Sequence, residues 1–595
     1  MIKSNLAAAV LLTLSAASAH AAITLQPVGR YQSPTAGFDT GAAEIVAFDA
    51  STRRIFVVNA QDGTVDVLDG SNPANPVKIT QIDVKTLPGI DPATLGAANS
   101  VAARNGLVAV AIEANPVTAN GVIAFYDAAT LDLLKTVEAG ALPDAVTFSN
   151  TGHFVIVSNE GEPRTPVDPQ GSVTIVDLRR RGNRPAFSSC TAGFEAFNAQ
   201  RAALVASGVY IDPGAATVAQ DLEPEYATAQ GNNAYVTLQE NNAIAVVQLN
   251  QCRVSRIMPI GVKDHGLAEN ALDTSDREIS TGNGGTAIRS WKNLYALYQP
   301  DSIASYEAAD GETYLVIANE GDARDTSNSG RPSTDAVRVG SLKLDSSAFP
   351  PVPPSVSADP NPASTKNLGR LNVIRSLGCE VPLDAAGFCR DAAGNAAEYD
   401  RLYAYGGRSF SILTNDGRMV YDSANDFESI IANKVGAGEL PRQAFNASHS
   451  NNSPGLIPGQ STNTFDSRSD DKGPEPEGVA VGRVGERTYA FVGLERIGGV
   501  MIYDVTDPAD AFYVDYVNGK AVRDFEQPVC TQVVSDASTN SGNCSNGVPN
   551  PAAGDLGPEG LAFVPAGDSP SGKPLLIVGN EISGSTRVYE VVAKD

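Results

Sequence analysis

The chain has 595 residues, a length that corresponds to about four average domains or to one large repeat architecture and exceeds what a single compact core accommodates. Its formal net charge of −25 argues against a nucleic acid or an anionic membrane as a partner. Its four histidines practically exclude a histidine-rich zinc site. The 55 glycines and 37 prolines, without Leu-rich helical runs, favour many short strands and turns.

The N-terminal segment, residues 1–21, predicts a cleaved secretory signal. Lys3 is followed by an apolar stretch from Leu6 to Leu14 and by small residues up to Ala21, which is the order of such a signal. No later stretch has 18 consecutive apolar residues, so we expect no membrane span. We therefore expect the mature chain, residues 22–595, to be exported, either to a periplasm or to the outside of the cell.

A weak repeat recurs seven times along the mature chain. Each unit opens with a short apolar strand, and in six of the seven units the opening starts with a carboxylate. The openings, in chain order, are Glu44–Phe48, Asn99–Ala102, Asp144–Phe148, Glu225–Thr228, Asp301–Ala304, Glu477–Ala480 and Glu559–Phe563.

A second apolar strand follows each opening after a turn and ends in a polar or acidic residue. A third strand usually follows, as in residues 64–68 and 121–126, and a fourth is visible in some units, as in residues 134–137. Short antiparallel strands that recur as four-stranded units predict a β-propeller, in which each unit is one blade around a central channel. The second strands end at Asn59, Glu113, Glu160, Glu240, Glu320, Glu495 and Glu581.

The sequence thus predicts an all-β fold: one propeller domain, residues 22–595, with seven or possibly eight four-stranded blades. Residues 402–421 are strand-like but lack an acidic opening, so they form either an eighth blade or an insertion in the fifth. Residues 25–31 could supply the fourth strand of the last blade and so close the ring. Two segments with loop composition, about 326–400 and 436–473, are expected to be long insertions.

The six cysteines can be structural, because an exported chain can keep disulfides. Six cysteines allow 15 connectivities, so the spacing gives only a preference. Neighbouring pairs would close short loops, which leaves the first two cysteines for each other. The preferred pairs are Cys379 with Cys389, Cys530 with Cys544, and Cys190 with Cys252.

The acidic residues of the repeat are expected to gather at one end of the channel. Antiparallel neighbours place the start of the first strand and the end of the second at the same edge, and the first strand of a blade lines the channel. Crowded carboxylates repel one another unless protons, basic side chains or cations compensate them. Oxygen ligands without histidine or thiolate favour Ca²⁺ or Mg²⁺. The alternative is that these acids accept backbone N–H bonds between blades and only hold loops.

Three segments narrow the prediction to particular side chains. Residues 159–162 and 319–325 place several carboxylates on a Gly turn, and residues 466–477 add cationic side chains. Carboxylates with nearby Arg and Lys could hold a metal ion and a phosphate together. The candidate metal ligands are Glu160, Glu162, Glu225, Glu320, Asp322, Asp470, Asp471, Glu475, Glu477 and Glu559. The candidate phosphate-binding residues are Arg324, Arg408, Arg468 and Lys472.

Other chemistry has little support in the sequence. The chain contains no G-x-S-x-G, P-loop, H-E-x-x-H or C-x-x-C motif. Residues 391–400 are acidic but lack the D-x-D-x-D-G spacing of a calcium loop. The three histidines of the mature chain, His153, His265 and His449, lie in dissimilar contexts, and we expect each to be a surface or loop residue.

The most specific signals are four multi-residue blocks that together extend over nearly the whole mature chain. They are residues 142–144 with 158–163, residues 299–301 with 318–324, residues 406–411, and residues 467–478. At these positions the chain resembles the choice-of-anchor I family, whose eukaryotic relatives are the mesenchyme-specific cell-surface glycoproteins linked to biomineralisation. The resemblance implies an exported propeller that handles divalent cations. Some members are described as atypical alkaline phosphatases or esterase-like proteins, but the resemblance supplies no catalytic residue.

Three functions follow as hypotheses. The first is Ca²⁺ binding at the acidic face, with a role in mineral, matrix or envelope interactions and without turnover. The second is calcium-dependent hydrolysis of phosphoesters, in which metal ions polarise the phosphoryl group and lower the pKa of an attacking water. The third, a protein-interaction platform, rests on analogy of fold alone.

Overall fold

The computed structural model describes residues 22–164, 166–181, 184–277, 286–324, 334–384, 387–449, 465–531, 534–536, 541–544 and 547–594. The secretory signal predicted for residues 1–21 lies outside this set. Parts of both predicted insertions, residues 325–333 and 450–464, lie outside it as well.

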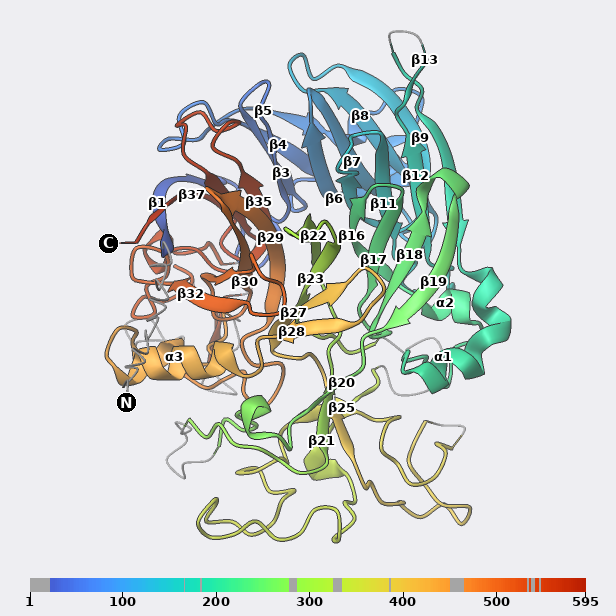
Figure 1. The fold of residues 1–595 in the computed structure, drawn as a ribbon, viewed down its shortest axis with the longest axis vertical. Coiled ribbons are helices and arrows are strands. Elements are labelled where there is room, and N and C mark those ends of the chain that lie inside the picture. Colours follow the sequence, from blue (N-terminus) through green and yellow to red (C-terminus); the bar gives the residue numbers. More distant parts are fainter. Residues whose placement is uncertain are drawn as a thin grey trace, which may run out of the picture.

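Seven four-stranded antiparallel sheets form the body of the described structure (Figure 1). In each sheet the strand order follows the chain from the first strand outward, except that β1 is the outer strand of the last sheet. The first four blades are β2 (Val46–Asp49), β3 (Arg54–Asn59), β4 (Thr64–Asp69) and β5 (Val77–Asp83); β6 (Leu95–Arg104), β7 (Leu107–Ala114), β8 (Asn120–Asp127) and β9 (Leu133–Ala141); β10 (Pro143–Phe148), β11 (Phe154–Asn159), β12 (Ser172–Asp177) and β15 (Ser188–Gly193); and β16 (Pro224–Gln230), β17 (Asn233–Leu238), β18 (Ala243–Gln248) and β19 (Arg253–Pro259). The other three are β22 (Ile303–Glu307), β23 (Thr313–Asn319), β27 (Ser409–Thr414) and β28 (Met419–Asp422); β29 (Pro476–Val484), β30 (Arg487–Leu494), β31 (Val500–Asp504) and β32 (Phe512–Val517); and β35 (Pro558–Val564), β36 (Leu575–Asn580), β37 (Ser585–Ala593) and β1 (Ile23–Gln32).

The innermost strands form a closed ring. Each one contacts the innermost strand of the next blade, in the order β2, β6, β10, β16, β22, β29, β35 and back to β2. The ring is sealed where β1 pairs with β37, from Ile23 opposite Ala593 to Gln32 opposite Ser585. The predicted seven-bladed propeller, with its first strand completing the last blade, is therefore confirmed.

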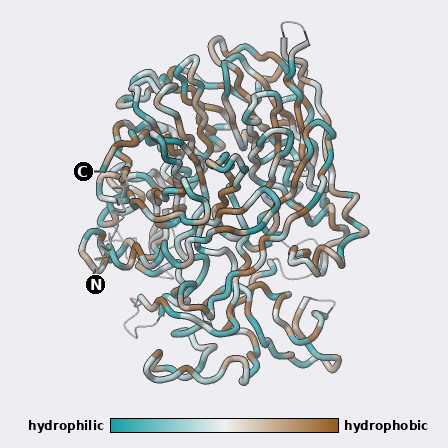
Figure 2. The backbone as a smooth tube through the Cα atoms, in the orientation of Figure 1, coloured by the Kyte–Doolittle hydropathy of each residue, from teal (hydrophilic) through white to brown (hydrophobic). Residues whose placement is uncertain are grey.

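The second strand of each blade shows why these residues fold in this way. Alternate side chains of a strand point to opposite faces, and both faces of an inner strand are covered by neighbouring blades. In β3, Ile55 and Val57 pack against the seventh blade, whereas Phe56 and Val58 pack against the second. All four side chains are at most 1% exposed. The apolar runs of the second strands thus fill the spaces between blades, and hydrophobic residues follow the blade strands in Figure 2.

The two insertions emerge from the edge at which the acidic residues were predicted. One leaves after β23 and returns at β27, and the other ends directly before β29. The first insertion joins residues 262–297 in a five-stranded sheet beside the propeller, at the bottom of Figure 1. Its strands are β20 (Val262–Asp264), β21 (Leu294–Leu297), β26 (Leu402–Ala404), β25 (Asn372–Ile374) and β24 (Ala336–Arg338).

This five-stranded sheet has its own hydrophobic core, which includes Trp291, Phe349 and Leu371. The insertion is therefore more structured than the loop expected from its composition, because its strands of three or four residues are too short for periodicity to reveal. The eighth-blade alternative for residues 402–421 is wrong. β27 and β28 complete the fifth blade, and only β26 belongs to the added sheet.

Helices are few in the described part of the chain, and none of them is long and apolar enough to cross a membrane. α3 precedes the sixth blade, with Asp426 and Glu428 in its first turn and Lys434 in its last, which suits the helix dipole. The α-helices are α1 (Arg201–Ser207), α2 (Val218–Asp221) and α3 (Asp426–Gly436). Short 3₁₀ helices lie at Val84–Thr86, Pro92–Thr94, Glu195–Gln200, Leu249–Gln251, Ala268–Asn270, Val339–Ser341, Arg442–Ala444 and Pro551–Ala553. Two short ribbons pair β13 (Arg180–Arg181) with β14 (Arg184–Pro185) and β33 (Val534–Asp536) with β34 (Ser541–Asn543).

Three disulfides join the pairs that the spacing favoured. Cys190 on β15 bonds to Cys252, which precedes β19, so this bridge links the outer strands of the third and fourth blades. Cys379–Cys389 closes a loop of the first insertion, and Cys530–Cys544 closes a loop between β32 and β35. Three disulfides and no free cysteine indicate folding in an oxidising compartment, as in exported proteins.

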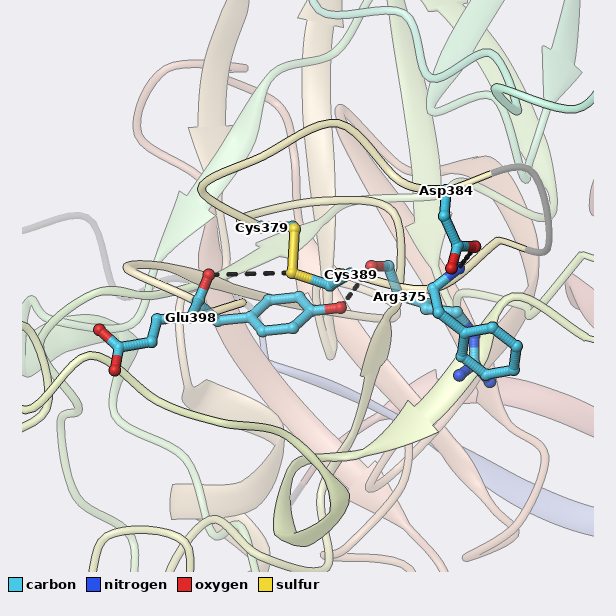
Figure 3. Close-up of a disulfide and its surroundings, with 7 residues drawn as sticks. Arg375, Cys379, Asp384, Cys389 and Glu398 are labelled. Atoms are coloured by element: carbon cyan, nitrogen blue, oxygen red, sulfur yellow. Dashed lines mark hydrogen bonds between the residues drawn. A yellow bond between two sulfur atoms is a disulfide. The ribbon is translucent and has the colours of Figure 1, made fainter. Parts of the chain in front are cut away.

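The bridge between Cys379 and Cys389 is shown in Figure 3. The Sγ atom of Cys389 lies 3.9 Å from the carbonyl oxygen of Glu398, and the backbone N–H of Phe388 donates to Asp384 at 2.9 Å. Tyr399 next to Glu398 donates its hydroxyl to the carbonyl oxygen of Arg375 at 2.9 Å. The disulfide therefore holds together a module that has only short strands of its own.

Candidate functional site

A cavity of about 680 Å³ opens at one end of the central channel. Of the 26 residues that line it, fifteen are Asp or Glu and two, Lys472 and Arg496, are basic. The acidic lining residues are Asp39, Glu44, Asp144, Glu160, Glu162, Glu223, Glu225, Glu240, Asp301, Glu320, Asp322, Glu477, Glu495, Glu559 and Glu581. We call this space the acidic cavity.

The opposite end of the channel is chemically different. A second cavity of about 700 Å³ shares Ile45, Ser100, Ala145, Tyr226 and Glu559 with the acidic cavity, so the two are the ends of one channel. Its other lining residues are mostly apolar and lie on the seven inner strands, with Phe148, Phe563 and Val564 among them. The crowding of acidic residues is therefore confined to one end.

Hairpin geometry brings the two acidic sets of each blade together. The backbone N–H of Glu160, after β11, donates to the carbonyl oxygen of Leu142, two residues before Asp144, at 2.9 Å. Glu495 and Glu581 bond in the same way, to Glu475 at 2.9 Å and to Gly557 at 2.8 Å. The end of the second strand is thus tied to the start of the first, as the antiparallel pattern predicts.

A Pro followed by an acid marks the start of five inner strands. The register of the first strand pair shifts between Pro143 and Ala145, so Asp144 lies in a β-bulge, and the same shift occurs at Glu225, Glu477 and Glu559. A bulge re-aims a side chain and proline limits ladder pairing. The Pro-acid pairs, which include Pro300-Asp301, are the sequence signal that most directly identifies cavity residues.

The residue before this Pro is conformationally unusual in several blades. Leu142, Gln299 and Glu475 have φ values of 47°, 47° and 50°, in the left-handed region, and Gly557 has a φ of 71°. A residue that precedes Pro normally prefers an extended conformation, and a positive φ is uncommon for residues other than Gly. Backbone strain of this kind concentrates at functional sites. Here it recurs directly beside the cavity acids.

Asn side chains hold the ends of two second strands. Asn159 donates from Nδ2 to the hydroxyls of Ser172 and Thr174 at 3.1 and 3.0 Å. Asn319 donates in the same way to Ser409 and Ser411, at 3.1 and 2.8 Å. Because these amides are fully buried, they fix the strand ends from which Glu160 and Glu320 project.

Burial and crowding raise the pKa of the cavity carboxyls. Burial, and then the charges of neighbouring acids, raise the pKa of Glu44 to about 8 and that of Asp144 to about 7. Burial likewise raises the pKa of Glu240 to about 7, although Arg324 opposes it. Six further acids have a pKa well above the usual range, chiefly because they are buried and secondly because of acidic neighbours. They are Glu160, Glu225, Asp301, Glu477, Glu559 and Glu581.

Several carboxylate oxygens in this cavity are buried without a hydrogen-bond partner among the described residues. They are Oδ2 of Asp301, Oε2 of Glu477 and Oε2 of Glu240. Asp301 is 6% exposed and Glu240 is 7% exposed. The negative charge of Asp301 also helps to raise the pKa of Glu225, after burial and the charges of Glu240 and Glu160. Such oxygens are suitable ligands for a hard cation.

The basic side chains that line the cavity lie in the sector of the fifth and sixth blades. The Nζ of Lys472 forms ion pairs with Glu320, with Glu475 at 3.3 Å and with Asp322 at 3.9 Å. The Nε of Arg496 lies 3.0 Å from Glu495 and 3.2 Å from Glu475. Despite burial, Arg468, Lys472 and Arg496 hold the pKa of Glu475 below its usual range. Arg496, with the contact from His449, does the same for Glu495.

Most of the remaining rim lacks such compensation, except that Glu223 pairs with the buried Arg324 at 2.9 Å and Glu162 pairs with Arg164. Among the described residues that line the cavity, no basic side chain other than Lys472 and Arg496 is present. The uncompensated sector, as we call it, comprises Glu44, Asp144, Glu160, Glu225, Asp301, Glu477 and Glu559.

Seven of the ten candidate metal ligands line the cavity, and three do not. Asp470 lies outside and pairs with Arg338 at 3.0 Å and Arg370 at 2.6 Å. Asp471 pairs with Arg468 at 3.0 Å. Glu475 is fully buried behind the wall, although its carboxylate lies within 4.8 Å of ligand atoms of Glu320 and Glu495. The lining seven are Glu160, Glu162, Glu225, Glu320, Asp322, Glu477 and Glu559.

Of the four candidate phosphate-binding residues, only Lys472 reaches the cavity. Arg324 is buried and pairs with Glu223 at 2.9 Å. Arg468 bonds to Glu475 at 2.6 Å.

Arg408 is also buried, and its contacts are to the chain itself. It donates to Glu428 at 2.6 Å and to the backbone carbonyls of Asp273, Ser469 and Asp471 at 2.8, 2.9 and 2.7 Å. This arginine therefore anchors loops and lines no cavity.

Sequence reasoning missed several residues at or near the site. Arg496, Glu223 and Tyr226 line the cavity, but nothing in their local sequence distinguishes them from ordinary strand or loop residues. Glu113, expected in the outer acidic set, does not line it and instead accepts the N–H of Ala97 at 3.2 Å. Glu113 belongs to the one unit whose opening lacks a carboxylate.

The expectation for the histidines is only partly met. All three lie in turns or loops, and His153 is exposed, but His265 and His449 are 2% and 1% exposed. The Nε2 of His449 lies 3.1 Å from Glu495 beside the cavity. Burial lowers the pKa of His265 to about 3 and also lowers that of His449, despite the favourable contact with Glu495. Both are surrounded by the folded insertions, whose extent the sequence did not reveal.

Two curated proteins are similar to parts of this chain. Gigasin-3a of Magallana gigas is 32% identical over 198 residues, which cover 33% of this chain and 60% of that protein. The mesenchyme-specific cell surface glycoprotein of Strongylocentrotus purpuratus is 30% identical over 312 residues, which cover 49% of this chain and 36% of that protein. The aligned regions thus span less than two thirds of either relative.

Among solved structures, hydrazine synthase of Kuenenia stuttgartiensis aligns with a TM-score of 0.40 and 10% identity, covering 95% of this chain and 99% of that one. The choice-of-anchor I domain matches residues 44–508, which include the first five blades, three strands of the sixth and both insertions that flank the acidic cavity. The chain therefore belongs to the choice-of-anchor I domain family.

Proposed function

We propose that this exported propeller binds a divalent cation, Ca²⁺ in the first place, in the uncompensated sector of the acidic cavity. One observation carries the proposal: buried carboxylate oxygens of Asp301 and Glu477, both in this sector, face the cavity without hydrogen-bond partners among the described residues. Leaving such groups unsatisfied is costly, and a hard cation with several oxygen ligands removes the cost.

The alternative in which the acids only hold loops has less support. In that case their oxygens would accept backbone N–H bonds, as Glu113 does from Ala97. The raised pKa of Glu225, Asp301 and Glu477 instead indicates that their charged forms are poorly stabilised by the chain itself. Calcium would supply that stabilisation. Its preference for flexible sets of six to eight oxygens suits a wide cavity better than the strict octahedron of Mg²⁺.

We favour binding over phosphoester hydrolysis. Arg324, Arg408 and Arg468 are engaged with carboxylates or carbonyls of the chain, so no arginine fork is directed into the cavity from the predicted set. Lys472 lies at the rim but is paired with Glu320. A relative named as a cell surface glycoprotein supports an extracellular or envelope role in which the bound cation bridges to matrix or mineral.

Isothermal titration of CaCl₂ into metal-stripped protein tests the proposal directly. We expect saturable binding with Ca²⁺ favoured over Mg²⁺, and proton release in buffers of different ionisation enthalpy, because protonated carboxyls must ionise to bind. A parallel assay with a phosphomonoester and a phosphodiester should show no calcium-dependent turnover. Absence of Ca²⁺ binding would refute the proposal, and calcium-dependent turnover would favour hydrolysis.

A further inference from the structure

A second group of buried oxygens lies outside the acidic cavity, where the loop before the sixth blade meets the segment that follows α3. Asp466, Asn446, Glu428 and Asp273 are each at most 2% exposed, and none of them lines the cavity. They come from three separate segments of the chain: the loop at 465–475, the α3 region, and the strand-free stretch before β21.

Hydrogen bonds place these side chains against one another. The hydroxyl of Ser469 donates to Oδ1 of Asp466 and accepts from Nδ2 of Asn446 at 2.8 Å. The same Nδ2 donates to Oε1 of Glu428 at 2.8 Å. Because a carboxylate can only accept, the nitrogen of the Asn446 amide must face Glu428, and this fixes the position of its oxygen.

Two oxygens of the group have no hydrogen-bond partner among the described residues. They are Oδ2 of Asp466 and Oδ1 of Asn446, on two side chains that are both 0% exposed. Both residues also have a positive φ, 62° for Asp466 and 36° for Asn446. Backbone strain and two buried, unsatisfied hydrogen-bond acceptors thus occur at the same place. Burying each such acceptor costs free energy unless a ligand satisfies it.

The charges in this group are not balanced by its one arginine. Arg408 is bound to Glu428 at 2.6 Å, and its other bonds go to backbone carbonyls. Burial, followed by the negative charge of Asp273, raises the pKa of Asp466 to about 10. A proton on Oδ2 of Asp466 would have no acceptor within hydrogen-bond distance. A cation would satisfy both the charge and the oxygens.

We propose that a second divalent cation, Ca²⁺, binds at this buried position, held by Oδ2 of Asp466 and Oδ1 of Asn446 with the carboxylate of Asp273 nearby. Carboxylate and amide oxygens are the usual calcium ligands. This ion is structural and independent of the cavity site. It joins the loop that carries Lys472 and Glu475 to the body of the protein, and so it holds the basic sector in place.

Counting bound ions after removal and replacement of Ca²⁺ tests this site. The protein is stripped with a chelator, reloaded with CaCl₂ and desalted, and its calcium content is measured by elemental analysis and native mass spectrometry. The double variant Glu225→Gln/Asp301→Asn, which disables the cavity site, should retain one Ca²⁺ per chain. Adding Asp466→Asn should remove that ion, whereas Asp471→Asn, an isosteric change in the same loop at a residue paired with Arg468, should not.

The outcomes separate the two sites. The wild type could bind a single ion that is lost in Asp466→Asn but kept in the cavity variant. This result would contradict the cavity site and leave the buried site standing. An unchanged ion count in Asp466→Asn would overturn the buried site. Asp466→Asn without Ca²⁺ should be at least as stable as the wild type, because it replaces a poorly solvated acid with a neutral amide. If this variant fails to fold, the cavity variant decides alone, and a count of zero ions in it overturns the buried site.

Discussion

Lys472 and Glu320 form an ion pair that joins the loop before the sixth blade to the end of β23 in the fifth. The same ammonium lies 3.3 Å from Glu475, and both carboxylates are nearly or fully buried. Lys472 therefore acts as a built-in counter-ion for one sector of a ring that also contains the uncompensated sector.

Removing this counter-ion should destabilise the propeller. Lys472→Gln leaves Glu320 and Glu475 with less compensation in a buried place, and breaking a buried pair costs about 3–5 kcal/mol in free energy of unfolding. Calcium should restore part of the loss, so the calcium-dependent rise in melting temperature should be larger than in the wild type. Chemical denaturation of metal-stripped and calcium-loaded protein measures both effects.

Arg179→Gln is the matched control for Lys472→Gln. Arg179 also pairs with a carboxylate, Asp177, but its side chain is 51% exposed. Exposed pairs contribute about 0–1 kcal/mol, so this variant should resemble the wild type. Equal effects of the two variants would show that Lys472 does not compensate a buried sector.

Stability should depend on pH in a direction opposite to that of most acidic proteins. The pKa values of Glu44, Asp144 and Glu240 are raised in the folded state to about 8, 7 and 7. A group with a raised folded-state pKa contributes stability that is complete below its unfolded value, near 4, and is lost as pH rises through the folded value. Metal-stripped protein should therefore lose stability between about pH 4 and pH 8.

Calcium should reduce this loss, because the cation stabilises the ionised carboxylates. Glu475 and Glu495, whose pKa values are lowered, make stability rise with pH instead. Their effect is confined to a lower pH range than that of the raised groups. Unfolding by urea at pH 5.0, 6.5 and 8.0 gives the slope of the free energy of unfolding against pH, once for metal-stripped protein and once with Ca²⁺. The same slope with and without Ca²⁺ would contradict cation binding by these groups.

The Cys190–Cys252 bridge should matter more for the stability of the propeller than the Cys379–Cys389 bridge. It spans 62 residues and joins the outer strands of two blades, whereas the other closes 10 residues within an insertion. Replacing Cys190 and Cys252 by Ser should lower the free energy of unfolding by about 2–5 kcal/mol. The double Ser variant at Cys379 and Cys389 should lose less, and a larger loss there would contradict this ranking.

Much of the propeller could be predicted from sequence, because its unit repeats. The apolar second strands and the acids at the strand ends recur in register, so seven weak signals support one another, and residues 25–31 fit the strand missing from the last blade. The five-stranded sheet could not be predicted in the same way. Its short strands come from segments far apart in the chain, and the parallel pairing of β21 with β26 has no local signature.

The candidate site was predictable only where the acids belong to the repeat. Pro143-Asp144 and its equivalents locate the rim, since a strand start fixes which edge a side chain occupies. The sequence did not distinguish Asp470 and Asp471, which are bound by arginines, from Glu477, which faces the channel. Those partners, Arg338, Arg370 and Arg468, are set by how the insertions fold against the blades.

The most direct test of the cation site in the channel compares the calcium-dependent change in melting temperature of three proteins. They are the wild type, Glu225→Gln/Asp301→Asn, and the control Glu312→Gln/Asp568→Asn, which removes two exposed acids outside the cavity. At a Ca²⁺ concentration about a hundred times its dissociation constant, a cavity site contributes about 2.7 kcal/mol to the wild type. We expect the control to keep this contribution and the cavity variant to lose it. Equal calcium stabilisation of all three proteins would contradict a cation site in the acidic cavity.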